Sequence, residues 1–174
     1  MTLTALYFAY GAHMDIATLR ERAGDVQVSC PARLAGYRLG FFGHDPVWDS
    51  GTETLVTEAA AETWGVLFQL RAAEWERLDT CMGATLEGNG AHFHYPVDVE
   101  TTLGERLEVR TFRKSVQGEP RLPSSEYVAF LVAAATSREL PAGYCEHLRA
   151  LPTSPAGYPV PRRDPAKRRH LHML

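Results

Sequence analysis

Three side chains near the start of the chain could bind a polar ligand or move a proton. Tyr7 and Tyr10 belong to an aromatic, apolar run, and His13 follows it two residues after Gly11. A phenol can donate a hydrogen bond, and an imidazole titrates near neutral pH. An unbroken apolar run is typical of a strand buried on both faces, and Asp15 is a good N-cap for a helix. We therefore predict a strand, a tight turn at Gly11 whose backbone N–H groups can hold an anionic or carbonyl oxygen, and a helix.

Two other groups of residues could carry chemistry. His92 and His94 are two apart on a predicted strand, so their side chains face the same way and could hold a metal, but no third ligand follows at a useful spacing. The three cysteines, one of which is Cys81, are an odd number without paired spacing, which argues against a disulfide framework and favours a reducing compartment. We predict no metal and no cofactor, and we interpret Cys81 as an inert thiol.

The elements that must position these residues alternate between strands and helices. Apolar patterning predicts further strands over residues 26–39, 52–57, 63–70, 92–99 and 106–114, and helices over 16–23, 72–79, 126–138 and 143–151. Residues 41–51 and 80–91 are predicted loops, because they are rich in glycine and polar residues. Pro31 indicates a bulge or an edge, and Gly65 indicates close approach by another backbone. This order predicts an α+β fold: a small mixed, largely antiparallel β-barrel with inserted and C-terminal helices.

Composition bounds the class of protein. The chain has 174 residues, of which 45% are hydrophobic and 22% charged, with a formal net charge of −3. That length suits one core, so we predict a single domain over residues 1–151, followed by a Pro- and Arg-rich C-terminal tail over 152–174 whose order depends on docking. The chain shows no basic excess for nucleic acid, and no apolar run approaches the roughly 20 residues that cross a bilayer. The opening residues lack the order of a signal peptide, so we expect no leader and a cytoplasmic protein.

Three motifs resemble the gamma-glutamylcyclotransferase family. The run Tyr7-Phe8-Ala9-Tyr10-Gly11, followed by Ala12, His13 and Met14, is similar to the family's opening Tyr-Phe-Ala-Tyr-Gly-Ser-Asn-Leu/Met. Residues 63–70 resemble the family's Val-Trp-Gly-Val strand. The helix that carries Tyr127, with the Leu140-Pro141 turn and the final helix, resembles the C-terminal half of the family. The likeness spans residues 4–151 and implies the same fold.

The resemblance also implies an activity that needs neither metal nor cofactor. Family members cut a gamma-glutamyl amide by turning its free α-amine onto its own side-chain carbonyl, which releases 5-oxoproline and an amine. Such a step needs a base that takes a proton from the ammonium and returns it to the leaving nitrogen, and hydrogen-bond donors for the oxyanion. The residues that would bind the small-molecule substrate are Tyr7, Phe8, Ala9, Tyr10, Gly11, Ala12, His13, Met82 and Tyr127.

The acid/base position departs from the family pattern. In the family it is the Glu of Leu-Asp-x-x-Glu-Gly, and the matching letters here, residues 78–83, place Met82 at that glutamate. A thioether cannot transfer a proton at pH 7. In a second register Leu86-Glu87-Gly88 is the match, and Glu87 is the acid/base after an insertion. The helix phase favours the first register and the spacing to Phe93 favours the second, while most loop glutamates are simply solvated.

The turn departs from the pattern as well. Ala12 and His13 replace the family's serine and asparagine, so that a hydroxyl and an amide are lost and an imidazole is gained. His13 could have taken over proton transfer, or it could bind a substrate of different shape.

These observations predict a gamma-glutamylcyclotransferase-like enzyme, of acyltransferase or lyase type, that acts on an amino-acid-derived amide by intramolecular cyclisation or a related acyl transfer. Glu87 and His13 are the catalytic candidates of an altered acid/base site. The alternative is a catalytically silent protein that binds a small molecule on the same fold. A cyclase or amide hydrolase of secondary metabolism is a third hypothesis. The expected partner is a small molecule, not nucleic acid or a membrane, and the protein is expected to be a monomer or a homodimer.

Overall fold

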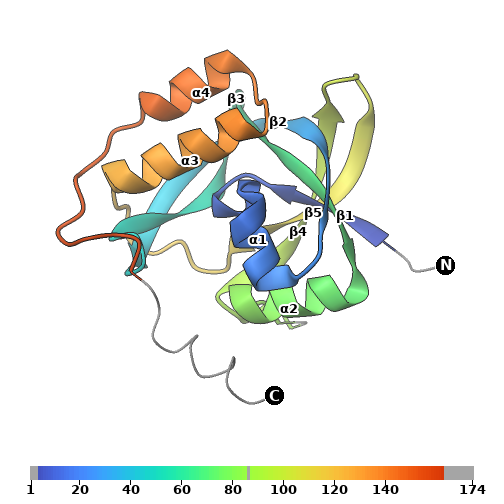
Figure 1. Ribbon diagram of the computed structural model, residues 1–174, viewed down its shortest axis with the longest axis horizontal. Coiled ribbons are helices and arrows are strands. Elements are labelled where there is room, and N and C mark those ends of the chain that lie inside the picture. The colour runs from blue at the N-terminus through green and yellow to red at the C-terminus, as the bar shows by residue number, and fades with distance from the viewer. Residues whose placement is uncertain (1–3, 86, 163–174) are drawn as a thin grey trace.

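A closed barrel organises the chain. The computed structural model describes residues 4–85 and 87–162. Within these residues the strands follow one another around the barrel in the order β1-β3-β2-β4-β5 (Figure 1). Their bounds are β1 (Thr4–Ala9), β2 (Gln27–Asp45), β3 (Ser50–Arg71), β4 (His92–Thr101) and β5 (Arg106–Lys114). With the helices described below, this architecture confirms the predicted fold class.

β1 is buried on both faces, as its apolar sequence predicts. Tyr7 and Ala9 face a core shared with the helices, whereas Phe8 and Tyr10 pack into a second core formed otherwise by residues of the strands. β1 pairs with β3 in antiparallel register, and it closes the barrel by a parallel pairing of Tyr7 with Arg110 on β5. The strand therefore delivers the Gly11 turn to one end of the barrel.

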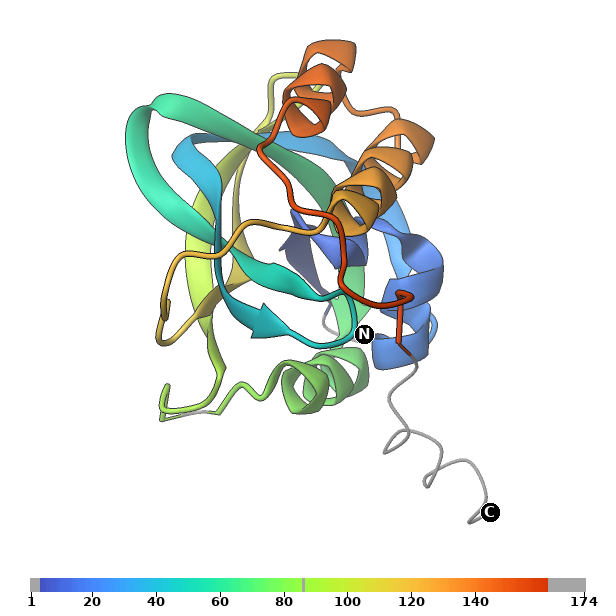
Figure 2. The same cartoon turned by 90° about the vertical axis from the view of Figure 1, so that its left-hand side faces the viewer.

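The long β2–β3 hairpin differs from the prediction. Residues 41–51, predicted as a loop, belong mostly to the two strands, and β3 runs without a break through the two strands predicted over 52–57 and 63–70. The prediction was wrong because the glycine and polar residues here sit at bulges and at the tight turn over residues 46–49, so the strands bend without ending. Figure 2 shows both ribbons curving around the barrel.

Two predictions about backbone irregularities in this hairpin are confirmed. The register of β2 against β3 shifts between Val28 and Pro31, which places the proline at a bulge. A Cβ added at Gly65 would clash with the carbonyl oxygen of Ala9, so β1 and β3 approach here as closely as a glycine permits.

The helices lie outside the barrel in two pairs (Figures 1 and 2). α1 (Ile16–Ala23) packs on α2 (Ala72–Met82), and α3 (Ser125–Ser137) packs on α4 (Ala142–Arg149), while a short 3-10 turn, η1 (Ala12–Met14), leads into α1. The Asp15 carboxylate caps α1 by accepting from the Thr18 amide, and the Ser124 hydroxyl caps α3 through the Tyr127 amide. α2 ends at Gly83 in the left-handed conformation, so Met82 is its last residue and not part of a loop.

The segment after α4 docks on the tip of the β2–β3 hairpin. The Gly157 amide donates to Asp49 Oδ2 at 2.7 Å, the Tyr158 hydroxyl to the Pro46 carbonyl at 2.8 Å, and the Arg162 amide to the Val47 carbonyl at 2.7 Å. We call residues 154–162 the C-terminal strap. The remainder of the predicted tail, residues 163–174, lies outside the described residues.

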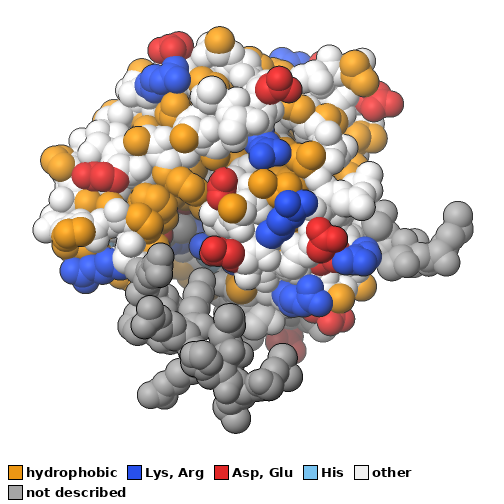
Figure 3. All heavy atoms as spheres, viewed as in Figure 1, with side chains coloured by type: hydrophobic (Ala, Val, Ile, Leu, Met, Phe, Trp, Pro, Cys, Tyr) orange, Lys and Arg blue, Asp and Glu red, His pale blue; other side chains and the backbone are white. Residues whose placement is uncertain are grey.

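Charged side chains are interspersed on the surface. On the face seen in Figure 3, acidic and basic residues lie among one another and do not gather into a patch of one sign. No helix in the described part of the chain is both long enough and apolar enough to cross a bilayer.

Candidate active site

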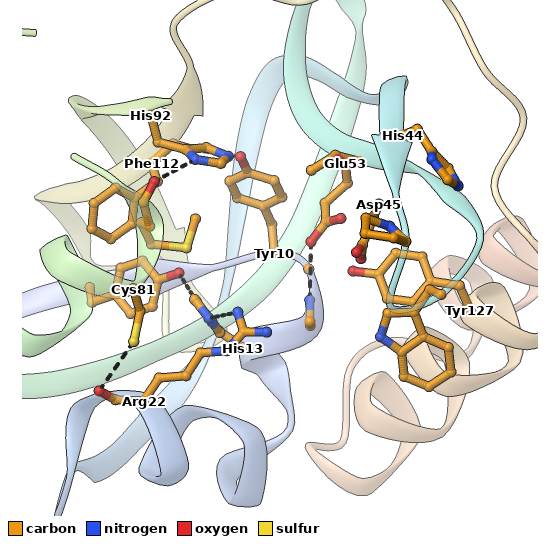
Figure 4. A pocket seen from close by; sticks show the side chains of 17 residues that line it. Tyr10, His13, Arg22, His44, Asp45, Glu53, Cys81, His92, Phe112 and Tyr127 are labelled. Carbon is orange, nitrogen blue, oxygen red and sulfur yellow. Dashed lines mark hydrogen bonds between the residues drawn. The ribbon is translucent and has the colours of Figure 1, made fainter. Parts of the chain in front are cut away.

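A cavity of about 280 Å³ opens beside the Gly11 turn (Figure 4). Its walls come from the end of β1, from α1, from the β2–β3 hairpin, from the end of α2, from β4 and β5 and from α3. Seven of the predicted binding residues line it: Tyr7, Tyr10, Gly11, Ala12, His13, Met82 and Tyr127. Sequence segments that lie far apart thus meet around one hollow, and three groups of side chains define its chemistry.

The first group is the turn and a carboxylate that the sequence analysis missed. The backbone amide of Ala12 donates a hydrogen bond to Glu53 Oε1 at 3.2 Å. Glu53 reaches the turn from β3, where it pairs with Phe41 of β2. A Cβ on Gly11 would clash with the Glu53 carboxylate, so the glycine is what admits this side chain. The N–H donor that the sequence predicted for a ligand oxygen is therefore engaged by the protein's own acid.

The second group is centred on His13, which is only 5% exposed. Its Nδ1 lies 2.7 Å from the Tyr7 hydroxyl, and its Nε2 lies 2.7 Å from Arg22 Nη1. A guanidinium only donates hydrogen bonds, so Nε2 is the acceptor and the ring proton is on Nδ1. Tyr7 then accepts from His13 and keeps its own O–H for another acceptor. Burial holds the pKa of Tyr7 well above its ordinary value, so this hydroxyl stays protonated.

The third group gathers two carboxylates around Tyr127. Figure 4 shows the Tyr127 hydroxyl next to Asp45 and Glu53. Burial, followed by the charge and hydrogen bonding of Glu53, holds the pKa of Tyr127 well above its ordinary value. The pKa of Asp45 is also raised, chiefly by burial and further by the Glu53 charge. Trp48, 5.2 Å from the Tyr127 ring between centroids, fixes this wall. The hollow thus holds acidic groups on one side, with Arg22 and His13 on another.

Met82 contributes an apolar surface to the same cavity, at the end of α2. His92 lines the cavity next to Met82, and its Nδ1 lies 2.8 Å from the Met82 carbonyl. Because a carbonyl only accepts, Nδ1–H is the donor. Burial lowers the pKa of His92. Its neighbour His94 instead lies 2.6 Å from Asp79 Oδ1, outside the cavity lining. Among the described residues no group of three or more His, Cys, Asp or Glu side chains is placed to hold a metal ion.

Three predicted site residues are not brought to the cavity. Glu87 is exposed in a turn and does not line the hollow. Phe8 and Ala9 are fully buried in the two cores and do not line it either.

The lining also includes residues that had not been predicted as site residues, among them Arg22, Asp45, Trp48 and Glu53. The weak signal for Glu53 was an acidic residue between two threonines within a predicted strand. Its face could not be assigned without the pairing of β3.

Known proteins share this architecture. A solved structure titled gamma-glutamyl cyclotransferase superposes with a TM-score of 0.83 at 25% identity and covers 91% of this chain and 94% of its own. Human gamma-glutamylcyclotransferase is 27% identical over 150 residues, which are 84% of this chain and 78% of the human protein. The mouse protein is 26% identical over 152 residues, covering 85% and 79% respectively. The fold and these sequence likenesses thus define a gamma-glutamylcyclotransferase-like protein.

A family model gives the family of the chain. The model of the AIG2-like family matches residues 62–148, from the second half of β3 to α4. The chain belongs to the AIG2-like family. The resemblance found in the sequence is therefore confirmed.

Proposed function

We propose that this protein is an enzyme that acts on an amino-acid-derived amide by intramolecular cyclisation, or by a closely related acyl transfer, through an altered acid/base site. The observation that carries the proposal is the charge layout of the cavity. Arg22 lies beside His13, whereas Asp45 and Glu53 lie on the other side with Tyr127 (Figure 4). A group with a carboxylate at one end and an ammonium at the other fits such a hollow, and that is the chemistry of an amino acid.

The reaction needs little from the protein because the nucleophile belongs to the substrate. The α-ammonium loses a proton, the amine attacks the side-chain carbonyl carbon, and the new C–N bond forms as the carbonyl oxygen gains negative charge. The attacking nitrogen then gives up a second proton, the leaving nitrogen takes up the two protons as its C–N bond breaks, and the products are a lactam and an ammonium. The protonated Tyr7, whose O–H is not used by His13, is a hydrogen-bond donor available to the developing oxyanion.

His13 serves this reaction best as a positioning residue. Both of its ring nitrogens are engaged, one by Tyr7 and one by Arg22, so a proton could reach Nε2 only after the Arg22 contact breaks. The ring instead orients the Tyr7 hydroxyl. The step requires no cofactor, and the free cysteines among the described residues suit the cytoplasmic location that we include in the proposal.

The proposal is tested by product analysis. The purified protein is incubated with gamma-glutamyl-alanine and with a panel of amides whose acyl part carries a free α-amine, and products are identified by mass spectrometry. We expect a lactam and the matching amine in equal amounts from at least one member of the panel. A panel in which every amide stays intact, at enzyme concentrations comparable to substrate, would rule the proposal out.

Met82 favours a second candidate function. A methionine in place of a carboxylate at the end of α2 is what a protein that keeps the cavity for binding alone would show. In that case amides would raise the melting temperature without product. The stabilisation is about 2.7 kcal/mol when the ligand is at 100 times its Kd.

A further inference from the structure

We propose that Glu53 is the general acid/base of this cavity and that it replaces, from β3, a carboxylate that the end of α2 lacks. The inference rests on the proposed function, since it assigns the proton transfer of that reaction. Within the described residues, two carboxylates line the cavity: Asp45 and Glu53. Their hydrogen bonds distinguish the two as candidates for proton transfer.

Glu53 is held in place as a catalytic carboxylate must be. Its Oε1 accepts from the Ala12 amide, and the missing side chain of Gly11 leaves the room for this contact. Its carboxylate also interacts with the Tyr127 hydroxyl from the other side. A side chain fixed at two points loses little freedom when the substrate binds, which is the preorganisation that proton transfer exploits.

Asp45 is the weaker candidate for the same role. It lies at the end of β2, and its Oδ1 accepts from the Val47 amide at 2.9 Å, a contact that builds the hairpin turn. Its pKa is raised by burial and by the Glu53 charge. The same repulsion makes the space between the two acids attractive to an ammonium group, which places the reacting amine beside Glu53.

Glu53 alone can carry both protons that the attacking nitrogen must lose. The ionised carboxylate takes the first proton from the substrate ammonium, the freed amine forms the new C–N bond, and the protonated carboxylate gives that proton to the leaving nitrogen. The carboxylate then takes the second proton from the attacking nitrogen as the old C–N bond breaks, and passes it to the released amine, which leaves as an ammonium. No oxidant, reductant or second substrate is required. Met82, on a different wall of the same cavity, contacts the substrate without taking part in the transfer.

The test compares three variants with the wild type on the amide that the wild type turns over best. Glu53→Gln keeps an oxygen for the Ala12 amide, and we expect its kcat to fall at least 100-fold, within the range typical of a lost general acid/base, with little change in KM. Met82→Glu in the Glu53→Gln background should recover at least tenfold of the loss. Glu58→Gln, an exposed acid on the same strand, is the matched control and should keep wild-type kcat.

The outcomes separate the inference from the proposed function. A wild type that binds the amides but forms no product defeats the proposed function. A productive wild type whose Glu53→Gln variant stays within tenfold of its kcat overturns the inference, as does a loss in Glu87→Gln with Glu53→Gln unaffected. A rise in KM without a fall in kcat, or no recovery by Met82→Glu, would make Glu53 a binding residue. If Glu53→Gln fails to fold, as judged by circular dichroism, kcat of the Gly11→Ala variant decides.

Discussion

Gly11 matters to the site because it has no side chain. The Glu53 carboxylate occupies the volume that a Cβ at position 11 would need, and it is the movable end of a flexible side chain. We expect Gly11→Ala to push the carboxylate away from the Ala12 amide and to reduce kcat at least tenfold, while the free energy of unfolding changes by less than about 1 kcal/mol. Steady-state kinetics and urea titration measure the two effects. Equal losses of stability and activity would instead show a folding role.

His92 couples the cavity to pH. Burial lowers its pKa below the ordinary value of 6.5, so between these two values the folded protein binds fewer protons than the unfolded chain. The stability that His92 contributes is therefore fully present above pH 6.5 and is lost as the pH falls toward its folded pKa. In His92→Asn, which keeps a donor for the Met82 carbonyl, the fall in unfolding free energy between pH 7.5 and 5.5 should be smaller than in the wild type.

The control for this pH dependence is the exposed His147. The His147→Asn variant should retain the full wild-type difference in unfolding free energy between the two pH values. A difference that is unchanged in His92→Asn, measured by urea titration, would contradict the assignment.

At the scale of elements, α2 brings Met82 and Cys81 to the cavity wall, and one buried carboxylate starts this helix. Glu74 is 1% exposed and accepts from the Arg71 amide at 2.7 Å and from the Arg71 guanidinium. Glu74→Ala would remove the acceptor of the Arg71 N–H at the start of the helix and the partner of its guanidinium, so we expect a loss of about 1–2 kcal/mol in unfolding free energy. Chemical denaturation measures it, and Glu76→Ala, on the exposed face of α2, should cost less than a third as much.

Much of this element order can be predicted from the sequence, because it depends on local patterns. The apolar run before Gly11, the caps at Asp15 and Ser124, and the bulge at Pro31 all follow from the preferences of single residues. The continuity of the β2–β3 hairpin cannot be predicted in the same way. Its turn and bulges use the residues that usually end a strand, and its continuity comes from pairing over many residues.

The residues of the candidate site also divide into those that local patterns predict and those that they do not. Residues of the opening motif, together with Met82 and Tyr127, could be predicted because they lie in recognisable local contexts. Glu53 and Asp45 could not, since what makes them part of a cavity is their register against β2 and the turn after β1. Glu87 was predicted because its neighbours in the sequence match the family motif, but it lies in an exposed turn.

At the scale of the whole molecule, the C-terminal strap braces the wall that carries Pro46 and Trp48. It holds the hairpin tip through hydrogen bonds to Asp49, Pro46 and Val47. We expect a chain ended after residue 153 to fold and to keep kcat. Its KM should rise about tenfold, which corresponds to a loss of about 1.4 kcal/mol in binding free energy, because the wall is less ordered. Kinetics measure the change, and faster hydrogen exchange at residues 45–49 should accompany it. Unchanged KM would show that the wall stands without the strap.

The way the barrel closes also bears on how the protein is made. β1 leaves the ribosome first, yet the strands that pair with it end at residues 71 and 114, and Tyr127 follows later still. A nascent chain must therefore carry an apolar strand that is unpaired until β3 has been made, and whose second edge is paired only when β5 follows. Stalled or prematurely ended translation products would expose that strand to chaperones and would lack a functional cavity, because the last wall of the cavity is added only when α3 emerges.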